Sequence, residues 1–487
     1  MFKINYIKFF NHQVFGNLEF NLSKNTNKSN YLSIIIGSNG TGKSILLQEL
    51  CEIFMSLSSS FETSKINMQG INNFELSYVL NGKDYLIRNI YDVDLKNNIY
   101  PETILAVSYN LNDKYPIVTS RNKLFTSRYK YLGLRSTTNN AFISKYRKNF
   151  IENIYNIFQI SGKIQILNDL FDNIQLPKDY NLILKAGKNY NAIFSDKKLT
   201  IEDFQKLIKG IINRKTRNIN KRFSDVRFEH LSINEKLQKE IIDFYNNNLL
   251  GKNLQLQKEN LIYKFSIDYS SLSNSFLKDF KQIQELISLE VLEIKELEIL
   301  KGNSYAYNSS SSGEFHLINS ITSIIAHITD NTLILIDEPE VSLHPNWQLK
   351  YIDLLNFILD KYKGCHTIIA THSHFLISNL KKENSTVLST KRDFSDNIKI
   401  KEISEDTFGW SAENILYNVF SMATTRNHYF EMELRKVIKY IAERDNSKIN
   451  EIKDFINKFR NNNLHSDDPL LKVISQAESF IQRVNND

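Results

Sequence analysis

The feature that most constrains this chain is a cluster of glycines near residue 40. The 487 residues include only 15 glycines and six prolines, well below the usual shares of about 7% and 5%. Three of these glycines nevertheless fall within eight residues, at 37, 40 and 42. An apolar, β-branched run at 31–36 precedes the cluster, and a helix-like run at 45–50 follows it. This order of strand, glycine loop and helix predicts an α/β domain with a buried sheet.

The glycine cluster has the spacing G-x-x-x-x-G-K-S, which suits phosphate binding. It reads Gly37-Ser38-Asn39-Gly40-Thr41-Gly42-Lys43-Ser44. Glycines let backbone N–H groups turn inward around a phosphate, and the dipole of the following helix adds to the attraction. We expect Lys43 to reach the β- and γ-phosphates of a nucleotide and Ser44 to bind Mg²⁺. The alternative is an ordinary glycine turn, which the strand–loop–helix context disfavours.

A second apolar strand, Leu333–Ile336, ends in two carboxylates. Ligands of open α/β sheets bind at the carboxyl ends of the strands. Asp337 is therefore expected to hold Mg²⁺, directly or through water, and Glu338 to orient and polarise an attacking water. The alternative is an acidic turn after a core strand. The presence of the phosphate loop in the same chain disfavours this alternative.

Two shorter elements lie on either side of this strand. A Ser/Gly loop at 309–314 precedes a helix-like run at 315–328, and a helix N-terminus of this kind attracts anions. Thr367–Ala370 is a predicted strand that ends in Thr371-His372-Ser373. His372 could donate a hydrogen bond to a γ-phosphate. A flexible serine linker and a structural histidine are the respective alternatives.

Together these elements resemble an ABC-type ATPase of the SMC, Rad50 and OLD-like group. Ser311, Ser312, Gly313 and Glu314 are similar to the signature loop and lie 26 residues before Asp337, counted from Ser311, although the serine run leaves the register open by one residue. His372, 35 residues after Asp337, matches the switch histidine. The segment 339–345 resembles the D-loop and contains Ser342 and His344. One departure is that Ser108-Tyr109-Asn110 stands where the family's Q-loop glutamine is expected.

The resemblance implies a fold, cofactors and a mechanism. The fold is an ABC-type P-loop ATPase head with a mixed sheet and an antiparallel β subdomain, interrupted by a large, mainly helical insertion. ATP and Mg²⁺ are the implied ligands, with Glu338 and His372 as catalytic residues. Two heads would pair head-to-tail, and the signature loop of one would close on the nucleotide of the other. His344 would then lie near the interface or have a packing role.

The spacing of the motifs predicts four regions. Lys43 and Ser311 are 268 residues apart, which argues for a large insertion and against a transporter subunit. We expect a first part of the head at 1–110, with a hairpin around Asn81-Gly82. A mainly helical insertion at 111–285 and the second part of the head at 286–400 follow, with a hairpin-like segment at 289–300 between them. A helical C-terminal domain at 401–487 is expected to bind a partner or to oligomerise.

The net charge of +7 is unevenly distributed. Nine Lys and Arg and no acidic residue lie between residues 114 and 148, interleaved with tyrosines. Seven more basic residues without an acid lie at 206–222, and the candidate nucleic-acid contacts are Arg214, Lys215, Arg217, Lys221 and Arg222. Subtracting these +16 charges from +7 leaves −9 on the rest of the chain. Such a stretch suits contact with phosphate backbones and bases; a solvated face or an acidic protein partner is equally compatible.

No nuclease site is expected in this chain, because no Asp-x-Asp follows His372 and no HNH-type histidine pair is left over. The segments 108–116, 131–133, 337–345 and 425–427 resemble the PtuA ATPase family of the Septu anti-phage system, including its retron-associated forms. That resemblance implies a homo-oligomer, a separate HNH nuclease partner held in check by nucleotide occupancy, and DNA, RNA or a reverse transcriptase complex as further candidate partners. The alternatives are a RecF- or SMC-like DNA repair ATPase and the ATPase sensor of a PARIS-type system with a Toprim partner.

Composition excludes several other classes. Two cysteines, Cys51 and Cys365, cannot form a disulfide framework or a four-cysteine zinc site. Residues 1–12 lack a signal-peptide pattern, and no run approaches the roughly 18 apolar residues of a membrane span. We therefore expect a cytoplasmic protein in a reducing compartment.

Overall fold

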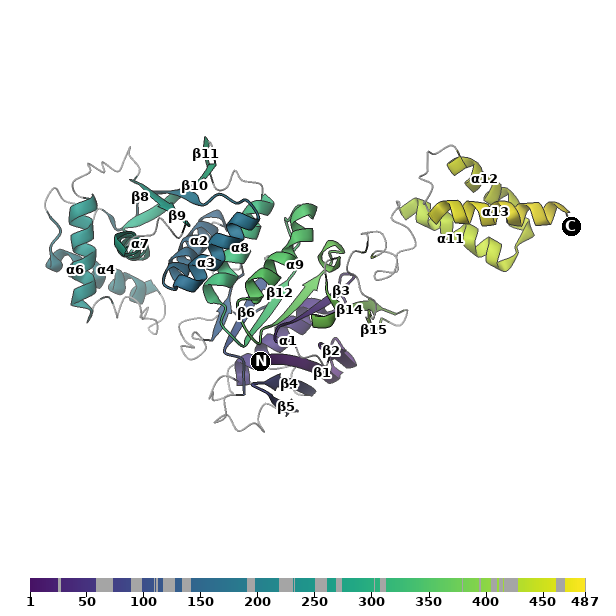
Figure 1. The fold of residues 1–487 in the computed structure, drawn as a ribbon, viewed down its shortest axis with the longest axis horizontal. Coiled ribbons are helices and arrows are strands. Elements are labelled where there is room, and N and C mark those ends of the chain that lie inside the picture. The colour runs from purple at the N-terminus through teal and green to yellow at the C-terminus, as the bar shows by residue number, and fades with distance from the viewer. Residues whose placement is uncertain are drawn as a thin grey trace. The chain divides into compact units, whose positions relative to one another are not determined.

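The computed structural model divides the chain into two compact units, Met1–Gly409 and Trp410–Asp487. Within them, the structure describes residues 1–24, 28–57, 73–88, 99–108, 110, 113–116, 128–133, 142–190, 198–218, 231, 233–249, 261–268, 274–301, 303–306, 312–378, 380–393, 396–403, 410, 415, 428–460 and 469–486. Figure 1 shows the elements of each unit.

A seven-stranded mixed sheet forms the centre of the first unit, in the order β15-β14-β3-β13-β12-β6-β7. All neighbouring strands are parallel except β15, which runs antiparallel to β14. The strands are β3 (Tyr31–Gly37), β6 (Thr103–Ser108), β7 (Tyr129–Tyr131), β12 (Thr332–Asp337), β13 (His366–Thr371), β14 (Ser385–Arg392) and β15 (Ile398–Glu402). The predicted strands that precede the glycine loop, the carboxylate pair and His372 are thus all present, and their carboxyl ends share one edge.

A four-stranded antiparallel sheet, ordered β2-β1-β4-β5, covers the helix that follows the phosphate loop. Its strands are β1 (Phe2–His12), β2 (Gly16–Asn21), β4 (Phe74–Leu80) and β5 (Lys83–Ile87), and the helix is α1 (Lys43–Leu57). Apolar side chains of α1 pack in one core with residues of both sheets, among them Phe2, Phe54 and Leu335. The hairpin predicted around Asn81 and Gly82 is confirmed, and both turn residues have positive φ, as a type I′ turn requires.

Helices α8 (Ser312–His327) and α9 (Pro345–Leu359) pack together, and α8 also contacts β6. They lie apart from α1 in Figure 1, with β12 between. In β12, Leu333 and Leu335 pack in the core with α1. Ile334 and Ile336 alternate with them, so they point to the opposite face of the sheet, and they are also fully buried. Burial on both faces explains why these strands are continuous apolar runs in the sequence. Two short 3₁₀ turns, Phe375–Ile377 and Lys382–Asn384, link β13 to β14.

The region between the two halves of the first unit contains a sheet as well as helices. Its strands form an antiparallel sheet in the order β11-β10-β8-β9. The strands are β8 (Asp179–Ala186), β9 (Leu261–Ser266), β10 (Leu292–Lys301) and β11 (Asn303–Ala306). The helices are α2 (Phe142–Phe158), α3 (Ser161–Asn173), α4 (Ile201–Asn218), α6 (Glu235–Phe244) with a π-turn at Tyr245–Leu249, and α7 (Asn274–Ser288).

The structure adds two strands to the sequence prediction for this region and corrects two of its details. Strands β8 and β9 lie within the segment expected to be mainly helical. The segment 289–300 is not a hairpin, because β10 runs through it as a single strand that pairs with β8 and β11. Strand β7 joins β6 in the central sheet, so that sheet continues beyond residue 110. Each of these strands is recruited by a partner distant in sequence, which local patterns do not reveal.

Two polar contacts fasten the insertion to the head. The Asn153 amide on α2 donates to the Ser323 hydroxyl on α8 over 2.7 Å. Lys163 on α3 donates to the carbonyl oxygen of Ala326, near the end of α8, over 2.9 Å. Burial lowers the pKa of Lys163 to about 8. These contacts attach the insertion to the helix that begins at the predicted signature loop.

The second unit contains three amphipathic helices around a small apolar core. They are α11 (His428–Glu443), α12 (Ile449–Arg460) and α13 (Pro469–Asn486), with a 3₁₀ turn at Asn446–Lys448. Ile452 and Ala477 are fully buried between them. These helices lie in the region predicted to be a helical domain, 401–487, but residues 401 and 402 belong to β15 and the second unit begins at Trp410. In the described parts of both units, no helix combines the length and the apolar character that a bilayer crossing requires.

A buried histidine joins three strands at the other end of the central sheet. His366 on β13 accepts a hydrogen bond at Nδ1 from the backbone N–H of Ile4 (2.9 Å). Its Nε2 lies 2.8 Å from the hydroxyl of Ser33 on β3. Full burial, with Lys3 nearby, lowers the pKa of His366 to about 3. The ring is therefore neutral when folded and joins β1, β3 and β13.

We predict that His366 makes folding stability fall as the pH decreases. Its pKa is near 6.5 in an unfolded chain and lower when folded, so the unfolded state binds the extra proton below about pH 6.5. Between about pH 7.5 and about pH 5 the wild type should lose roughly 2 kcal/mol more than His366→Gln in urea unfolding. His344→Gln, at an exposed position, is the control and should keep the wild-type slope. An equal slope for His366→Gln would contradict this role.

Candidate nucleotide site

The phosphate loop connects β3 to α1 and depends on glycine at two positions. Gly40 and Gly42 have φ values of +77° and +83°, which side-chain-bearing residues rarely adopt. A Cβ atom on Gly42 would also lie 2.5 Å from the ring of Phe15. The loop is therefore pressed against the turn between β1 and β2, with its backbone curved around the end of α1.

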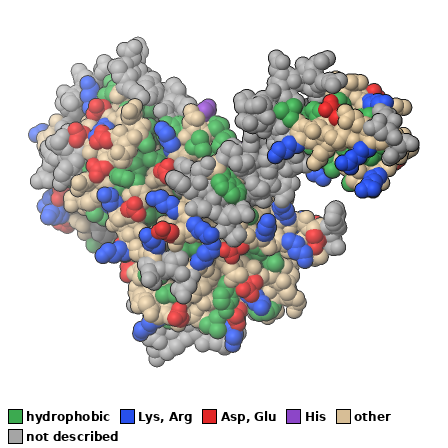
Figure 2. Space-filling view, turned by 45° about the vertical axis from the view of Figure 1, so that its right-hand side comes forward, with side chains coloured by type: hydrophobic (Ala, Val, Ile, Leu, Met, Phe, Trp, Pro, Cys, Tyr) green, Lys and Arg blue, Asp and Glu red, His purple; other side chains and the backbone are tan. Residues whose placement is uncertain are grey.

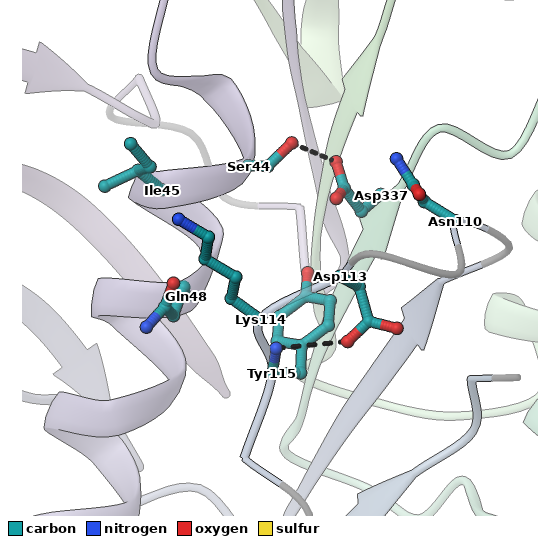
Figure 3. Close-up of a pocket in the computed structure, with 8 residues that line it drawn as sticks. All are labelled: Ser44, Ile45, Gln48, Asn110, Asp113, Lys114, Tyr115 and Asp337. Atoms are coloured by element: carbon teal, nitrogen blue, oxygen red, sulfur yellow. Dashed lines mark hydrogen bonds between the residues drawn. The ribbon is translucent and has the colours of Figure 1, made fainter. Parts of the chain in front are cut away.

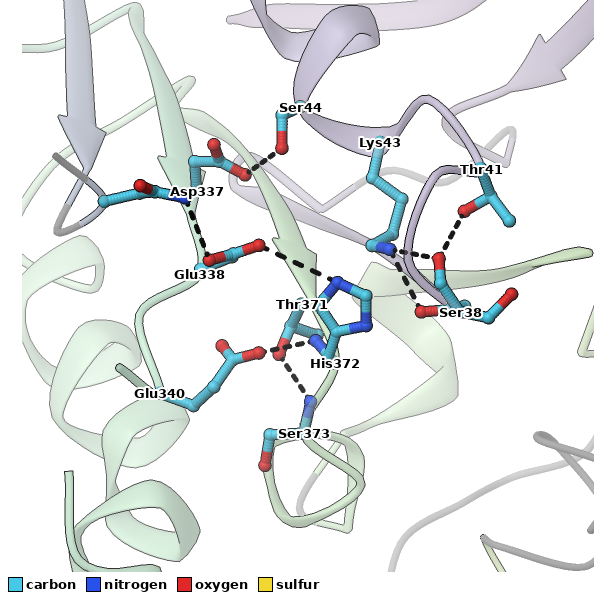
Figure 4. A network of polar contacts seen from close by, with 12 residues as sticks. Ser38, Thr41, Lys43, Ser44, Asp337, Glu338, Glu340, Thr371, His372 and Ser373 are labelled. Atoms are coloured by element: carbon cyan, nitrogen blue, oxygen red, sulfur yellow. Dashed lines mark hydrogen bonds and ion pairs between the residues drawn. The ribbon is translucent and has the colours of Figure 1, made fainter. Parts of the chain in front are cut away.

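Lys43 is held at the mouth of this loop (Figure 4). Its Nζ donates to the carbonyl oxygens of Gly37 (3.0 Å) and Ser38 (2.9 Å). Burial lowers the pKa of Lys43 to about 8, whereas the nearby carboxylates, Glu338 first, favour its charged form. The ammonium group is thus the cation that faces a cluster of acidic side chains.

Ser44 and Asp337 bring the two predicted halves of the site together. The Ser44 hydroxyl donates to Asp337 Oδ1 over 2.9 Å. Burial, with smaller effects from neighbouring carboxylates, raises the pKa of Asp337 to about 7 despite this hydrogen bond. A cavity of about 100 Å³ adjoins the pair, lined also by Gln48, Asn110 and Asp113 (Figure 3).

This arrangement fits Mg²⁺. A buried carboxylate that lacks a cation is unfavourable, and Mg²⁺ prefers a few protein oxygens completed by water and substrate phosphates. Ser44 and Asp337 supply two such oxygens beside the phosphate loop. No cluster of three or more His, Cys, Asp or Glu residues suited to a metal occurs among the described residues.

Glu338 occupies a strained backbone position between two neighbours. Its φ is +50°, and its N–H donates to the carbonyl oxygen of Ala370 on β13 (2.9 Å). One carboxylate oxygen, Oε1, lies 3.7 Å from Nε2 of His372. Positive φ at a residue other than glycine costs about 1–3 kcal/mol and clusters at functional sites. The Glu338 carboxylate lies near the His372 ring and the Lys43 ammonium group (Figure 4).

His372 lies between Lys43 and Glu338, at the end of β13. Partial burial is the main cause of its lowered pKa; the charge of Lys43 lowers it further and Glu338 opposes the shift. The backbone N–H of His372 donates to Glu340 Oε1 over 2.5 Å. The structure therefore brings both predicted catalytic residues to one place, facing Lys43 (Figure 4).

Sequence reasoning missed Asn110 as part of this site. Its side-chain Nδ2 lies 3.5 Å from Glu338 Oε2, so Glu338 has Asn110 beside one oxygen and His372 beside the other. Asp113 orders the same loop by accepting from the Tyr115 N–H (3.1 Å) and the Tyr131 hydroxyl (2.5 Å). Asn110 thus stands where the Q-loop glutamine is expected, but it approaches the second carboxylate. Its position just beyond β6, the neighbour of β12, was the available signal.

Sequence reasoning also missed a set of hydrogen bonds that link the predicted D-loop to the end of β13. Gln348 on α9 donates to the carbonyl oxygen of Leu343 (2.8 Å) and accepts from the Ser373 hydroxyl (2.6 Å). Glu340 makes the parallel contact with His372 described above. The segment 339–345 and the end of β13 are therefore mechanically joined. No spacing rule identifies such contacts, because they depend on how α9 packs.

The other predicted site residues lie in different settings. Ser342 is exposed with φ +64°, and His344 is exposed and caps α9 by accepting from the Asn346 N–H (3.3 Å). His344 therefore caps α9, and its predicted place near an interface stays a prediction. Helix α8 begins at Ser312, so Ser312, Gly313 and Glu314 are in its first turn, whereas Ser311 lies outside the described residues. Their predicted action on a partner's nucleotide stays a prediction.

The basic segments are only partly described. Arg214, Lys215 and Arg217 lie on α4, with side chains outside the described set, and Lys221 and Arg222 lie outside it altogether. In the first segment, Arg128 packs on the Tyr100 ring, 4.6 Å from its centroid, and Arg147 donates to the carbonyl oxygen of Lys295. On the face drawn in Figure 2, described basic and acidic side chains are interspersed.

The tyrosines of the first basic segment differ from the expectation of base stacking. Tyr115 and Tyr129 are 2% and 3% exposed and belong to the core around α1. Their rings are therefore unavailable to nucleic acid bases. The apolar ring of tyrosine makes it a common core residue. The spacing of these tyrosines among lysines does not show whether their rings are buried or exposed.

Comparison with known proteins places this site in a family context. The Septu protein PtuA of Bacillus thuringiensis is 29% identical over 153 residues, which are 31% of this chain and 37% of that protein. The match thus spans little more than a third of that relative. A probable ATPase of retron Ec83 from Escherichia coli is 24% identical over 432 residues, covering 82% of this chain and 72% of the relative.

Solved structures give weaker likenesses. The Smc head domain of Pyrococcus furiosus, solved with the C-terminal domain of ScpA, aligns over 83% of this chain and 97% of its own, with 11% identity and a TM-score of 0.32. The recombination mediator RecF aligns over 82% of this chain and 98% of its own, with 12% identity and a TM-score of 0.28.

The family model described as AAA ATPase domain matches residues 2–377, which include the phosphate loop, Asp337, Glu338 and His372. This span is well over half of the chain. The chain therefore belongs to the AAA ATPase domain family (AAA_15) and is related to the Septu and retron ATPases.

Proposed function

We propose that this chain binds and hydrolyses ATP as the regulatory subunit of a cytoplasmic bacterial anti-phage defence complex, and that it controls a separate HNH-type nuclease through nucleotide-dependent pairing of heads. The observation that carries the ATPase part is the convergence of Lys43, Ser44, Asp337, Glu338 and His372 at one edge of the central sheet. The defence assignment is supported by the names of the relatives.

The roles of the residues follow from their positions. Lys43 would exchange its two loop carbonyls for phosphate oxygens, which are stronger acceptors because they are charged. Ser44 and Asp337 would hold Mg²⁺, which when bound neutralises phosphate charge. Glu338 would accept a proton from the attacking water, and His372 would donate to the γ-phosphate. The strained backbone of Glu338 keeps its carboxylate in place before the substrate arrives.

Head pairing is supported by exposed positions at the predicted interface. Ser342 is exposed just after the carboxylates. Glu340 accepts from the backbone N–H of His372, and Gln348 links the Leu343 carbonyl to the Ser373 hydroxyl. Contact of a second head with the segment 339–345 would therefore reach His372 through its hydrogen bond with Glu340, and the adjacent Ser373 through Gln348. Such a link gives a partner head a physical means of setting the hydrolysis rate.

The alternative of a DNA-clamping repair ATPase is less well supported. Two of the tyrosines expected to contact bases are in the core. Arg147, from the same segment, donates to the backbone of β10 at Lys295. The candidate residues on α4 and beyond it remain open for either a nucleic acid or a protein partner.

Lys43→Ala should weaken binding of a fluorescent ATP analogue by more than about 100-fold, roughly 2.7 kcal/mol, because a charged donor to phosphate is lost. Lys83→Ala, at an exposed position on β5, is the control and should bind as the wild type does. Unchanged affinity in Lys43→Ala would refute the role of this loop.

Glu338→Gln should still bind ATP but hydrolyse it about 100-fold more slowly or worse, because the amide cannot accept the proton. We expect the variant to accumulate as a paired species with Mg-ATP in size-exclusion chromatography with light scattering. Glu383→Gln, at an exposed position, serves as the control. Turnover at the normal rate in Glu338→Gln would eliminate this carboxylate as the catalytic base.

A tagged chain expressed with its native neighbouring genes should co-purify with an HNH-type nuclease. Nuclease activity of the purified complex should increase when nucleotide is removed, since occupied heads are proposed to restrain it. Lys43→Ala provides the nucleotide-free comparison. If no nuclease is encoded alongside and none co-purifies, the regulatory part of the proposal fails while the ATPase part stands.

A further inference from the structure

The end of β14 lies directly against the phosphate loop. Strand β14 runs parallel to β3, and its Thr390 is paired with Gly37, the first glycine of the loop. A Cβ atom on Gly37 would lie 2.2 Å from the carbonyl oxygen of Thr390. Because β14 continues past this pair to Arg392, its last residues extend alongside the loop.

Arg392 hydrogen-bonds to the phosphate loop at a single carbonyl oxygen. Its Nε and Nη2 atoms both donate to the carbonyl oxygen of Gly40, over 2.9 and 2.7 Å. Its Nη1 atom donates to the carbonyl oxygen of Asp396 (2.8 Å) and pairs with the Asp396 carboxylate (2.9 Å). The guanidinium group is thus anchored on one side by Asp396 and holds Gly40 on the other.

Thr390 makes a second contact with the same part of the loop. Its hydroxyl lies 2.9 Å from the Thr41 hydroxyl and 3.2 Å from the carbonyl oxygen of Ile36. Thr41 in turn donates to the carbonyl oxygen of Ser38 (3.0 Å). Two consecutive loop residues, Gly40 and Thr41, are therefore held from β14.

The hydrogen bonds from Arg392 to the Gly40 carbonyl oxygen affect how the loop can bind phosphate. A trans peptide is planar, so its C=O and the N–H of the next residue point in opposite directions. Fixing the Gly40 carbonyl toward Arg392 therefore points the Thr41 N–H away from Arg392. Glycine backbones are otherwise freer than any others. Without an external hold, the Gly40–Thr41 peptide would sample other orientations and its N–H would be lost as an anion donor.

We propose that Arg392, supported by Thr390, is a positioning residue that keeps the phosphate loop in its binding conformation and thereby sets nucleotide affinity. This proposal rests on the proposed function of the loop in binding ATP. Arg392 does not need to touch the nucleotide, because each of its three guanidinium nitrogens already donates to Gly40 or Asp396. Its effect is to reduce the ordering that ATP would otherwise have to impose on the loop.

The test compares Arg392→Ala, Arg392→Lys and the control Lys391→Ala, the neighbouring position on β14, whose side chain points to the opposite face. Binding of a non-hydrolysable fluorescent ATP analogue with Mg²⁺ and hydrolysis at saturating ATP are measured separately. Arg392→Ala should raise the dissociation constant about tenfold and leave the rate at saturating ATP within about twofold. Arg392→Lys should not restore affinity, since an ammonium group lacks the planar fork. Lys391→Ala should match the wild type.

Thermal unfolding separates a positioning role from a general structural one. The nucleotide-free melting temperature of Arg392→Ala should equal that of the wild type, whereas the increase on adding ATP should shrink. Wild-type affinity in Arg392→Ala, or full recovery in Arg392→Lys, would overturn the proposal. Either of these outcomes, obtained while the wild type binds ATP and Lys43→Ala does not, refutes the role of Arg392 and leaves the proposed ATP-binding function standing. If the wild type itself fails to bind ATP, the proposed function falls instead.

Discussion

The order of three parallel strands is the constraint on which the rest of the site depends. Strand β13 lies between β3 and β12, and all three point the same way. Their carboxyl ends therefore place the phosphate loop, His372 and the carboxylate pair side by side. The hydrogen bond from Ser44 to Asp337 spans residues 293 positions apart and closes this edge. His372 lies between Lys43 and Glu338 because its strand lies between theirs.

Burial makes the charged forms of the side chains at this edge of the sheet unfavourable. Three carboxylates, those of Asp337, Glu338 and Glu340, surround one ammonium group, and burial raises the pKa of Asp337 and Glu340 and lowers that of Lys43. Charges kept out of water favour whatever neutralises them. In the proposed function a metal cation and a polyphosphate would do so together, the first beside Asp337 and the second beside Lys43.

Much of the core and of the site was predictable from local patterns. The strands before the phosphate loop, Asp337 and His372 are apolar runs buried on both faces, and each motif carries its chemistry in adjacent residues. Asn110, Glu340, Gln348 and Arg392 were not predictable in this way. Each acts through a partner brought close by strand order or helix packing, and an isolated polar residue carries no local signal of that partner. The strands β8 and β9 were missed for the same reason.

The sequence by itself determined that this chain folds around a phosphate loop and carries the residues proposed to act in ATP hydrolysis, because glycine spacing and strand-end carboxylates are local properties. Only the tertiary structure decided which strands are neighbours. It thereby decided that His372 faces Glu338, that Tyr115 and Tyr129 lie in the core, and that Arg392 holds Gly40. These outcomes depend on contacts between segments hundreds of residues apart, whose pairing is set by the burial of whole strand and helix faces rather than by any short pattern.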